Sequence, residues 1–322
     1  MIRGDVREIF ERLMVSLWLR PERALWDAHE LAAVVQLLGP AFARPALEYG
    51  CTDGINTFVM LGGKVGFDFD DYADLLEGQS ITPHKRDYFE TTGTNVPTPR
   101  ADETTQRFDV GISWKQSHIE KAARLEIYDK LSVAELGHPI IGYTDGSFET
   151  IWSPNLYWNM ADVLQAMLAD HVRLLSSTGR LVTILPIADQ ADSEFWSKMH
   201  FMPSDWFREM DRGIADNLTR NAKSDAEWRD VFRTVGLKVS RHEPFLPEMV
   251  GSVYQIGLRP MFPALMEAYK ILKTENLQGW REFKQHWIET ASHFLLPLCD
   301  VSPSTLPGHR PLWHVYELRR VR

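Results

Sequence analysis

The sequence is poor in several features that mark specialised classes of protein. Only 2 of its 322 residues are cysteines, so a disulfide framework is excluded and a reducing, cytoplasmic environment is expected. No apolar run approaches the ~20 residues that cross a bilayer. The opening MIRGDVREIFERLM mixes charged and apolar residues, unlike a signal peptide. The net charge of -9 disfavours binding to phosphate backbones. We therefore expect neither a membrane nor a nucleic acid as partner.

Motifs of several common enzyme classes are also missing. There is no HExxH or CxxC, and the two cysteines lie far apart, so no metal site is expected. The motifs GxxxxGK[ST], GxSxG and GxGxxG are absent as well. Their absence argues against a phosphate-loop NTPase, the commonest α/β hydrolase and a nicotinamide-dependent oxidoreductase.

What the sequence does contain is an alternation of strand and helix patterns. Apolar spacing predicts two helices before Gly39, separated at Arg20-Pro21-Glu22. Further helices are predicted over 116–125, 160–175 and 225–235. Residues 177–179 are predicted to cap the second of these helices. Strands are predicted over 45–49, 108–112, 131–134, 148–152, 180–185, 237–241 and 313–318, the last as a closing edge strand. The alternation predicts a doubly wound α/β fold with a mainly parallel sheet.

We expect one domain over 1–322. Its expected parts are N-terminal helices (1–40), a core (41–188) with an inserted excursion (74–107), two covering segments (189–222 and 247–308) and the remaining core (223–246 and 309–322). Covering elements of open α/β sheets lie at the carboxyl ends of the strands, so these segments predict a helical cap. Its aromatic and methionine side chains favour an apolar or aromatic small molecule: Trp196, Met199, Phe201, Met202, Trp206 and Phe207.

One turn in the core is suited to ligand binding. Glu48 lies near the end of the first predicted strand, and Gly50 to Gly54 form a tight turn before a helix. Glycine permits positive φ and close approach, so a ligand can lie against backbone N–H groups there. Taken alone, the pattern also fits an ordinary strand-to-helix turn.

Five segments, in order, resemble the class I S-adenosylmethionine-dependent methyltransferases. They are LEYGCTDG (47–54), DVGISW (109–114), SVAEL (132–136), DGSFETIWS (145–153) and LSSTGRLVTILP (175–186). The resemblance implies a Rossmann-like sheet of seven strands with the last antiparallel. It also implies S-adenosylmethionine as cofactor and S-adenosylhomocysteine as product. The expected reaction is in-line methyl transfer to a secondary metabolite or sugar-like molecule in a water-shielded, apolar site.

The resemblance further implies a set of cofactor contacts. They are Glu48, Gly50, Cys51, Thr52, Asp53, Gly54, Ser113, Trp114, Glu135, Leu136, Ser153, Asn155 and, for the methionine carboxylate, Arg20. Thr52 replaces the family's middle glycine, and Ser113 replaces the acid that binds the ribose. Asp68 is an alternative to Ser113, although the spacing after Ser113 fits the family better. Both departures favour a second hypothesis, a scaffold of this fold that binds the cofactor weakly or not at all.

A catalytic base is needed only where the acceptor must lose a proton. The candidates are Tyr157, His200 and His242, and each of them also fits a structural role. No Asn/Asp-Pro-Pro-Tyr/Trp motif of amino-group methylation follows the fourth predicted strand. The acceptor atom, the base and the formation of a homodimer are left open by the sequence.

Overall fold

A computed structural model describes residues 4–39, 41–69, 106–154, 156–188, 214–275, 277–302 and 311–321. The expected excursion 74–107, apart from its last two residues, lies outside these ranges, as do Asn155 and His200. The six aromatic and methionine residues expected in the cap lie outside them too. The domain limits therefore stay a prediction.

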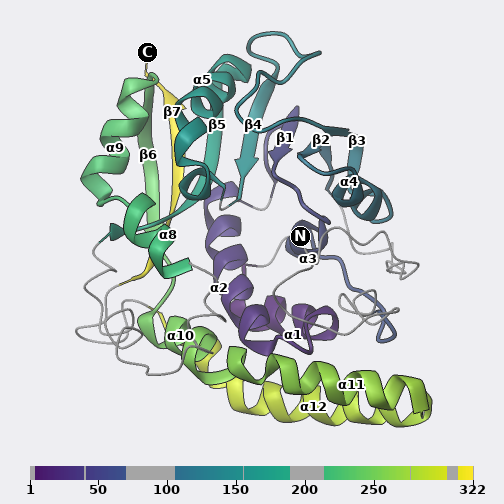
Figure 1. The fold of residues 1–322 in the computed structure, drawn as a ribbon. Helices are drawn as coiled ribbons and strands as arrows, with labels where there is room; N and C mark the ends of the chain where they lie inside the picture. Colours follow the sequence, from purple (N-terminus) through teal and green to yellow (C-terminus); the bar gives the residue numbers. More distant parts are fainter. Residues whose placement is uncertain are drawn as a thin grey trace.

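Seven strands of the described residues form one sheet in the order β3-β2-β1-β4-β5-β7-β6 (Figure 1). They are β1 (Ala46–Tyr49), β2 (Phe108–Ser113), β3 (Tyr128–Val133), β4 (Phe148–Ser153), β5 (Leu175–Pro186), β6 (Leu237–Pro244) and β7 (Trp313–Arg320). The strands from β3 to β5 pair in parallel, and β7 runs antiparallel to both of its neighbours. The predicted doubly wound sheet with an antiparallel last strand is confirmed.

The last strand does not lie at an edge, so that expectation is wrong. β7 pairs with β5 through Leu318 and Leu181, and with β6 through Arg320 and Leu237. Four consecutive residues of β7, from Val315 to Leu318, are buried. The edge strands β3 and β6 each expose several residues instead. Alternation in a sequence indicates a strand, but it does not say how many neighbours that strand has.

The helices largely follow the predicted pattern. They are α1 (Val6–Ser16), α2 (Pro21–Leu38), α3 (Ile55–Met60), α4 (Gln116–Ala123), α5 (Leu164–Leu174), α8 (Ile214–Asn221), α9 (Asp225–Thr234), α10 (Glu248–Ser252), α11 (Phe262–Glu275) and α12 (Leu277–Cys299). Pro21 fits the first turn of α2 because the N–H that proline lacks has no helical partner there.

The region between β4 and β5 differs from the sequence prediction. Two 3-10 turns, Tyr157–Asn159 and Ala161–Val163, precede α5, so the helix begins later than expected. α5 continues directly into β5, which begins at Leu175. The expected helix cap at 177–179 is thus part of a strand. The polar residues there are largely exposed, which is why their composition resembles that of a turn.

Helices from both ends of the described chain pack together beyond one end of the sheet (Figure 1). α12 packs against α1 and α2, and α11 packs along α12. The Trp287 indole of α12 donates a hydrogen bond to the Trp18 carbonyl at 2.8 Å. Among the described residues, no helix is both long and apolar enough to cross a membrane.

Candidate functional site

The Gly50–Gly54 turn follows β1 at the point where the strand order reverses. β1 lies between β2 and β4, so the chain continues to opposite sides of it. Open α/β sheets bind ligands outside the carboxyl ends of strands at such a point. Gly50 and Gly54 have φ of 96° and 80°, and Thr52 has φ of 48°. Thr52 therefore adopts the left-handed conformation that glycine favours, at a cost of about 1–2 kcal/mol.

Hydrogen bonds hold this turn against β2 and begin α3. The N–H groups of Gly50 and Cys51 both donate to the Ile112 carbonyl, at 2.8 and 3.0 Å. The Asp53 carboxylate accepts from the Ile55 N–H at 3.1 Å, and burial raises the pKa of Asp53. The turn is thus fixed by its own backbone and by the strand next to it.

Glu48 has protein partners on both carboxylate oxygens. Oε1 accepts from the Thr57 hydroxyl at 2.7 Å, and Oε2 accepts from the Tyr128 hydroxyl at 2.8 Å. The residue is only 1% exposed, and burial raises its pKa to about 7 although both hydrogen bonds lower it. Glu48 joins β1 to α3 and β3, and its contact with a ligand stays a prediction.

Of the two candidates for the second strand, Phe108–Ser113 lies beside β1. At the end of that strand, the Ser113 hydroxyl is buried and lies 2.6 Å from His118 Nδ1. Asp68 lies elsewhere: it forms an ion pair with Arg281 of α12, with the Arg281 Nε 3.0 Å from Asp68 Oδ1. The sequence did not predict His118 as the partner of Ser113.

Trp114 and Leu156 flank the turn. A Cβ built on Gly50 would lie 3.4 Å from Leu156 Cδ2 and 3.9 Å from Trp114 Cζ3. The Trp114 ring also packs edge-on against His118, with 5.1 Å between the ring centroids. An aromatic face therefore lies next to the carboxyl ends of β1 and β2.

The other expected contacts are less close to the turn. Ser153 ends β4 and is buried, so it shares the carboxyl edge of the sheet with Ser113. Glu135 follows β3 with its side chain 80% exposed, 3.6 Å from His138, and Leu136 is partly buried beside it. Arg20, at the start of α2, forms an ion pair with Glu22 and lies over the rings of Tyr254 and Phe262. Its carboxylate partner is thus a residue of the same chain.

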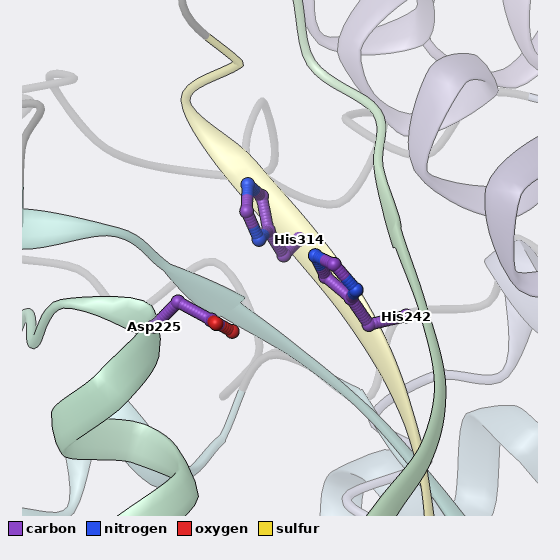
Figure 2. A group of neighbouring side chains, drawn as sticks. All are labelled: Asp225, His242 and His314. Atoms are coloured by element: carbon purple, nitrogen blue, oxygen red, sulfur yellow. The ribbon is translucent and has the colours of Figure 1, made fainter.

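The described candidate bases have quite different surroundings. The Tyr157 hydroxyl is buried against His171 Nδ1, and burial raises the pKa of Tyr157. Burial also lowers the pKa of His171 to about 4. His242 lies instead on β6, close to His314 of β7 and Asp225 of α9 (Figure 2). Neither His171 nor His314 was predicted, because only the fold brings them beside Tyr157 and His242.

Comparison with known proteins gives structural likeness only. No family model and no curated protein matches the sequence. The chain is similar to the [4+2]-cyclase SpnF, at 12% identity over 93% of this chain and 82% of that one, with a TM-score of 0.47. A putative sarcosine dimethylglycine methyltransferase from Galdieria sulphuraria gives 12% identity, 94% and 88% coverage and a TM-score of 0.47. Geranyl diphosphate methyltransferase in complex with SAM is 13% identical over 95% of this chain and 91% of that one, with a TM-score of 0.44.

At these identities and TM-scores the likeness says nothing of the reaction. The deciding observation is the order and direction of the strands in the described sheet. The described residues form the doubly wound sheet of seven strands, the last of them antiparallel, that the resemblance to the class I methyltransferases implies. In this sheet, the Gly50–Gly54 turn follows the carboxyl end of β1, where the resemblance to the methyltransferases places their first motif.

Proposed function

We propose that the chain is an S-adenosylmethionine-dependent methyltransferase that acts on a small molecule. The observation that carries the proposal is the left-handed turn Gly50–Gly54 at the reversal point of this sheet. With no side chain at Gly50, a ligand can approach the backbone there. The short distance from β1 to the ends of β2 and β4 would let one ligand contact all three strands.

The residues around the turn fit parts of the cofactor. Trp114 offers a ring for the adenine, and Leu156 offers an apolar wall beside Gly50. Ser113 offers a hydroxyl near the expected ribose, but its bond to His118 makes it a weaker partner than a carboxylate. We therefore expect binding to rely on stacking and backbone contacts more than on a charged ribose contact.

When bound, S-adenosylmethionine supplies a methyl group that its sulfonium already activates. The chain would then orient the acceptor in line with that methyl group and exclude water. A buried tyrosine whose pKa is raised is unsuited as a base near neutral pH, which disfavours Tyr157 in that role. We propose an acceptor that needs little help in losing a proton.

A row of aromatic rings supports an apolar or aromatic acceptor. Trp158, which follows β4, lies 5.4 Å from Trp313 at the start of β7, measured between ring centroids. Trp313 lies 5.7 Å from Trp26 of α2, and Trp26 lies 4.9 Å from Tyr254. Because β7 is antiparallel, its start lies at the same edge as the end of β4. Trp158 and Trp313 are buried at the carboxyl edge of the sheet, the edge that also carries the Gly50–Gly54 turn.

A second candidate function is a scaffold that does not use the cofactor. The Ser113–His118 contact favours it, because the hydroxyl at the ribose position is already engaged within the protein. The replacement of an acid by serine removes the charged contact expected there. The two candidates differ in one measurable property, the affinity for S-adenosylmethionine.

Calorimetric titration of the full chain with S-adenosylmethionine and S-adenosylhomocysteine tests the proposal. We expect a Kd in the micromolar range, equivalent to about -8 kcal/mol. Trp114→Ala should weaken binding by about fivefold or more, because stacking of a base on an aromatic side chain contributes about 1–3 kcal/mol. Phe294→Ala, which removes an exposed ring on α12, serves as the matched control and should bind like the wild type.

The two ways in which this experiment can fail are distinguishable. Folded protein that gives no heat at two temperatures with either compound would favour the scaffold. Tight binding that Trp114→Ala leaves unchanged would keep the cofactor but place its adenine away from Trp114.

A further inference from the structure

Three side chains that commonly bind metal ions converge near the carboxyl end of β6. They are Asp225, the first residue of α9, His242 of β6 and His314 of β7 (Figure 2). One ligand atom from each lies within 4.8 Å of the other two. Among the residues that the structure describes, these three form the one group of three or more His, Cys, Asp or Glu residues whose ligand atoms lie this close together.

The strand register explains why the two imidazoles meet. His242 pairs with Tyr316, and Pro244 pairs with His314. Residues two apart along a strand share a face of the sheet, so His242 and His314 are diagonal neighbours on one face. Their ring centroids are 5.1 Å apart. Figure 2 shows the Asp225 carboxylate pointing toward these two rings.

The start of α9 is held firmly over this face. Ser224 caps the helix in a reciprocal arrangement with Glu227, which fixes the backbone just before Asp225. One turn later, the Trp228 indole donates to the Pro186 carbonyl at the end of β5, at 3.0 Å. Asp225 therefore approaches the two histidines from a fixed helix end.

We propose that Asp225, His242 and His314 bind one divalent transition-metal ion, with Zn²⁺ as the best match. Two imidazoles and one carboxylate are a donor set typical of zinc, whereas Mg²⁺ prefers oxygen ligands alone. Three protein ligands also leave a fourth position for water or another small ligand.

The distances are close to those that zinc requires. Three atoms no more than 4.8 Å apart all lie within about 2.8 Å of a common point. Zinc bonds to nitrogen and oxygen measure about 2.0–2.2 Å. Each ligand atom must therefore move inward by no more than about 0.7 Å, which small side-chain rotations provide.

The outer hydrogen bonds around Asp225 suit a metal ligand. The Asp225 carboxylate accepts hydrogen bonds from Arg229 Nε and from the Tyr316 hydroxyl. Those bonds measure 2.7 and 2.8 Å and would orient the carboxylate as outer-shell partners do.

Arg229 is also the main competitor of the ion. Its guanidinium holds one oxygen of Asp225, and a positive charge near the ion weakens binding. A carboxylate has about four lone-pair sites, so one oxygen can accept from Arg229 and still bind a metal. Removal of this charge should therefore tighten metal binding.

The proposed metal site is separate from the turn after β1. Three strand spacings separate β1 from β7 and four separate β1 from β6. At about 4.8 Å per spacing these correspond to about 14 and 19 Å. An ion there would not touch the transferred methyl group, and His242 is poorly placed as its base. We assign to the ion a role in joining α9 to β6 and β7, independent of the proposed methyl transfer.

The test uses the full chain without an affinity tag, after treatment with a chelator. Calorimetry with Zn²⁺ should give one equivalent bound, and Co²⁺ should develop the visible ligand-field absorption of a tetrahedral site. His242→Gln and His314→Gln should each weaken Zn²⁺ binding at least tenfold, whereas Arg229→Gln should strengthen it. His286→Gln removes an exposed histidine of α12 and should change nothing.

Failure of this proposal is distinct from failure of the cofactor proposal. Absence of Zn²⁺ binding by the folded wild type, or binding that both glutamine variants retain in full, would overturn the site. If a histidine variant does not fold, two other measurements still test the site. They are the Co²⁺ spectrum of the wild type and the affinity of Arg229→Gln for Zn²⁺. S-adenosylmethionine titrations of the same samples should be unaffected by Zn²⁺.

Discussion

At the scale of single residues, burial of an acid creates a specific pH dependence. Burial raises the pKa of Glu48 from 4.5 to about 7. Between these values the folded state keeps a proton that the unfolded state has lost, so stability falls as the pH rises through this window. Glu48→Gln removes the charge and keeps the shape. We expect its free energy of unfolding to exceed that of the wild type by about 1–3 kcal/mol at pH 8, and to be similar at pH 5.

Urea unfolding at pH 5 and pH 8 checks this prediction. Glu48→Ala is the informative comparison, because it leaves the hydroxyls of Thr57 and Tyr128 without their acceptor and should destabilise at both pH values. A glutamine variant that is less stable than the wild type at both pH values would contradict the assignment of Glu48 as a protonated, buried acid near neutral pH. Glu48→Ala is accordingly a poor test of cofactor binding, since it alters the fold as well.

The residues also mark the limit of prediction from sequence. Glu48, Gly50 and Ser113 were placed correctly at strand ends, because short motifs report local backbone geometry. Their partners Tyr128 and His118 were not predicted. Such side chains are brought in by other elements of the fold, and a spacing along the chain carries no information about them. For the same reason, Asp225 and His314 were not predicted as neighbours of His242, from which they lie 17 and 72 residues away in the sequence.

At the scale of elements, α12 is joined to the core by a buried charge. Lys284 is 0% exposed, and its ammonium donates to the carbonyls of Phe67 and Phe69 at 2.7 Å each. The rings of Trp18 and Trp280 also lie within 5.8 Å of the ammonium nitrogen. Hydrogen bonds and cation–π contacts together compensate for the cost of burying this charge.

Lys284→Met should therefore destabilise the protein by about 2–4 kcal/mol, because two carbonyls lose a buried donor. The measurement is the free energy of unfolding in urea, followed by far-UV circular dichroism. Lys273→Met is the matched control: Lys273, on the neighbouring α11, donates to the Tyr269 hydroxyl and should contribute less than about 1 kcal/mol. Equal losses in both variants would mean that Lys284 contributes through its methylene chain and not through its charge.

Element boundaries followed the sequence where apolar periodicity was strong and departed where polar residues occupy strands. α2 and α9 agree with their predicted ranges to within about a turn. β5 begins at Leu175, five residues before the predicted Arg180, because its first residues are polar and partly exposed. A strand that extends past the packed core has no reason to alternate, so its sequence resembles a turn.

At the scale of the whole molecule, the sequence predicted the fold class but not every neighbour in the sheet. The alternation of strands and helices indicated a doubly wound sheet, and the resemblance supplied the antiparallel last strand. The position of β7 between β5 and β6 depends on pairing between residues at least 70 apart in the sequence, as Pro244 and His314 are. No local pattern reports such a long-range choice.

Hydrogen exchange distinguishes an inner β7 from an edge strand. β7 pairs on both sides, with β5 and with β6, so its amides alternate between two neighbours and should exchange slowly. β6 lies at the edge of the described sheet, and about half of its amides should exchange faster. We expect peptides over 313–320 to be protected at least tenfold more than peptides over 237–244 in mass-spectrometric exchange near neutral pH. Exchange at equal rates in the two strands would mean that β7 is held from one side only, because an inner strand must open two ladders before its amides meet water.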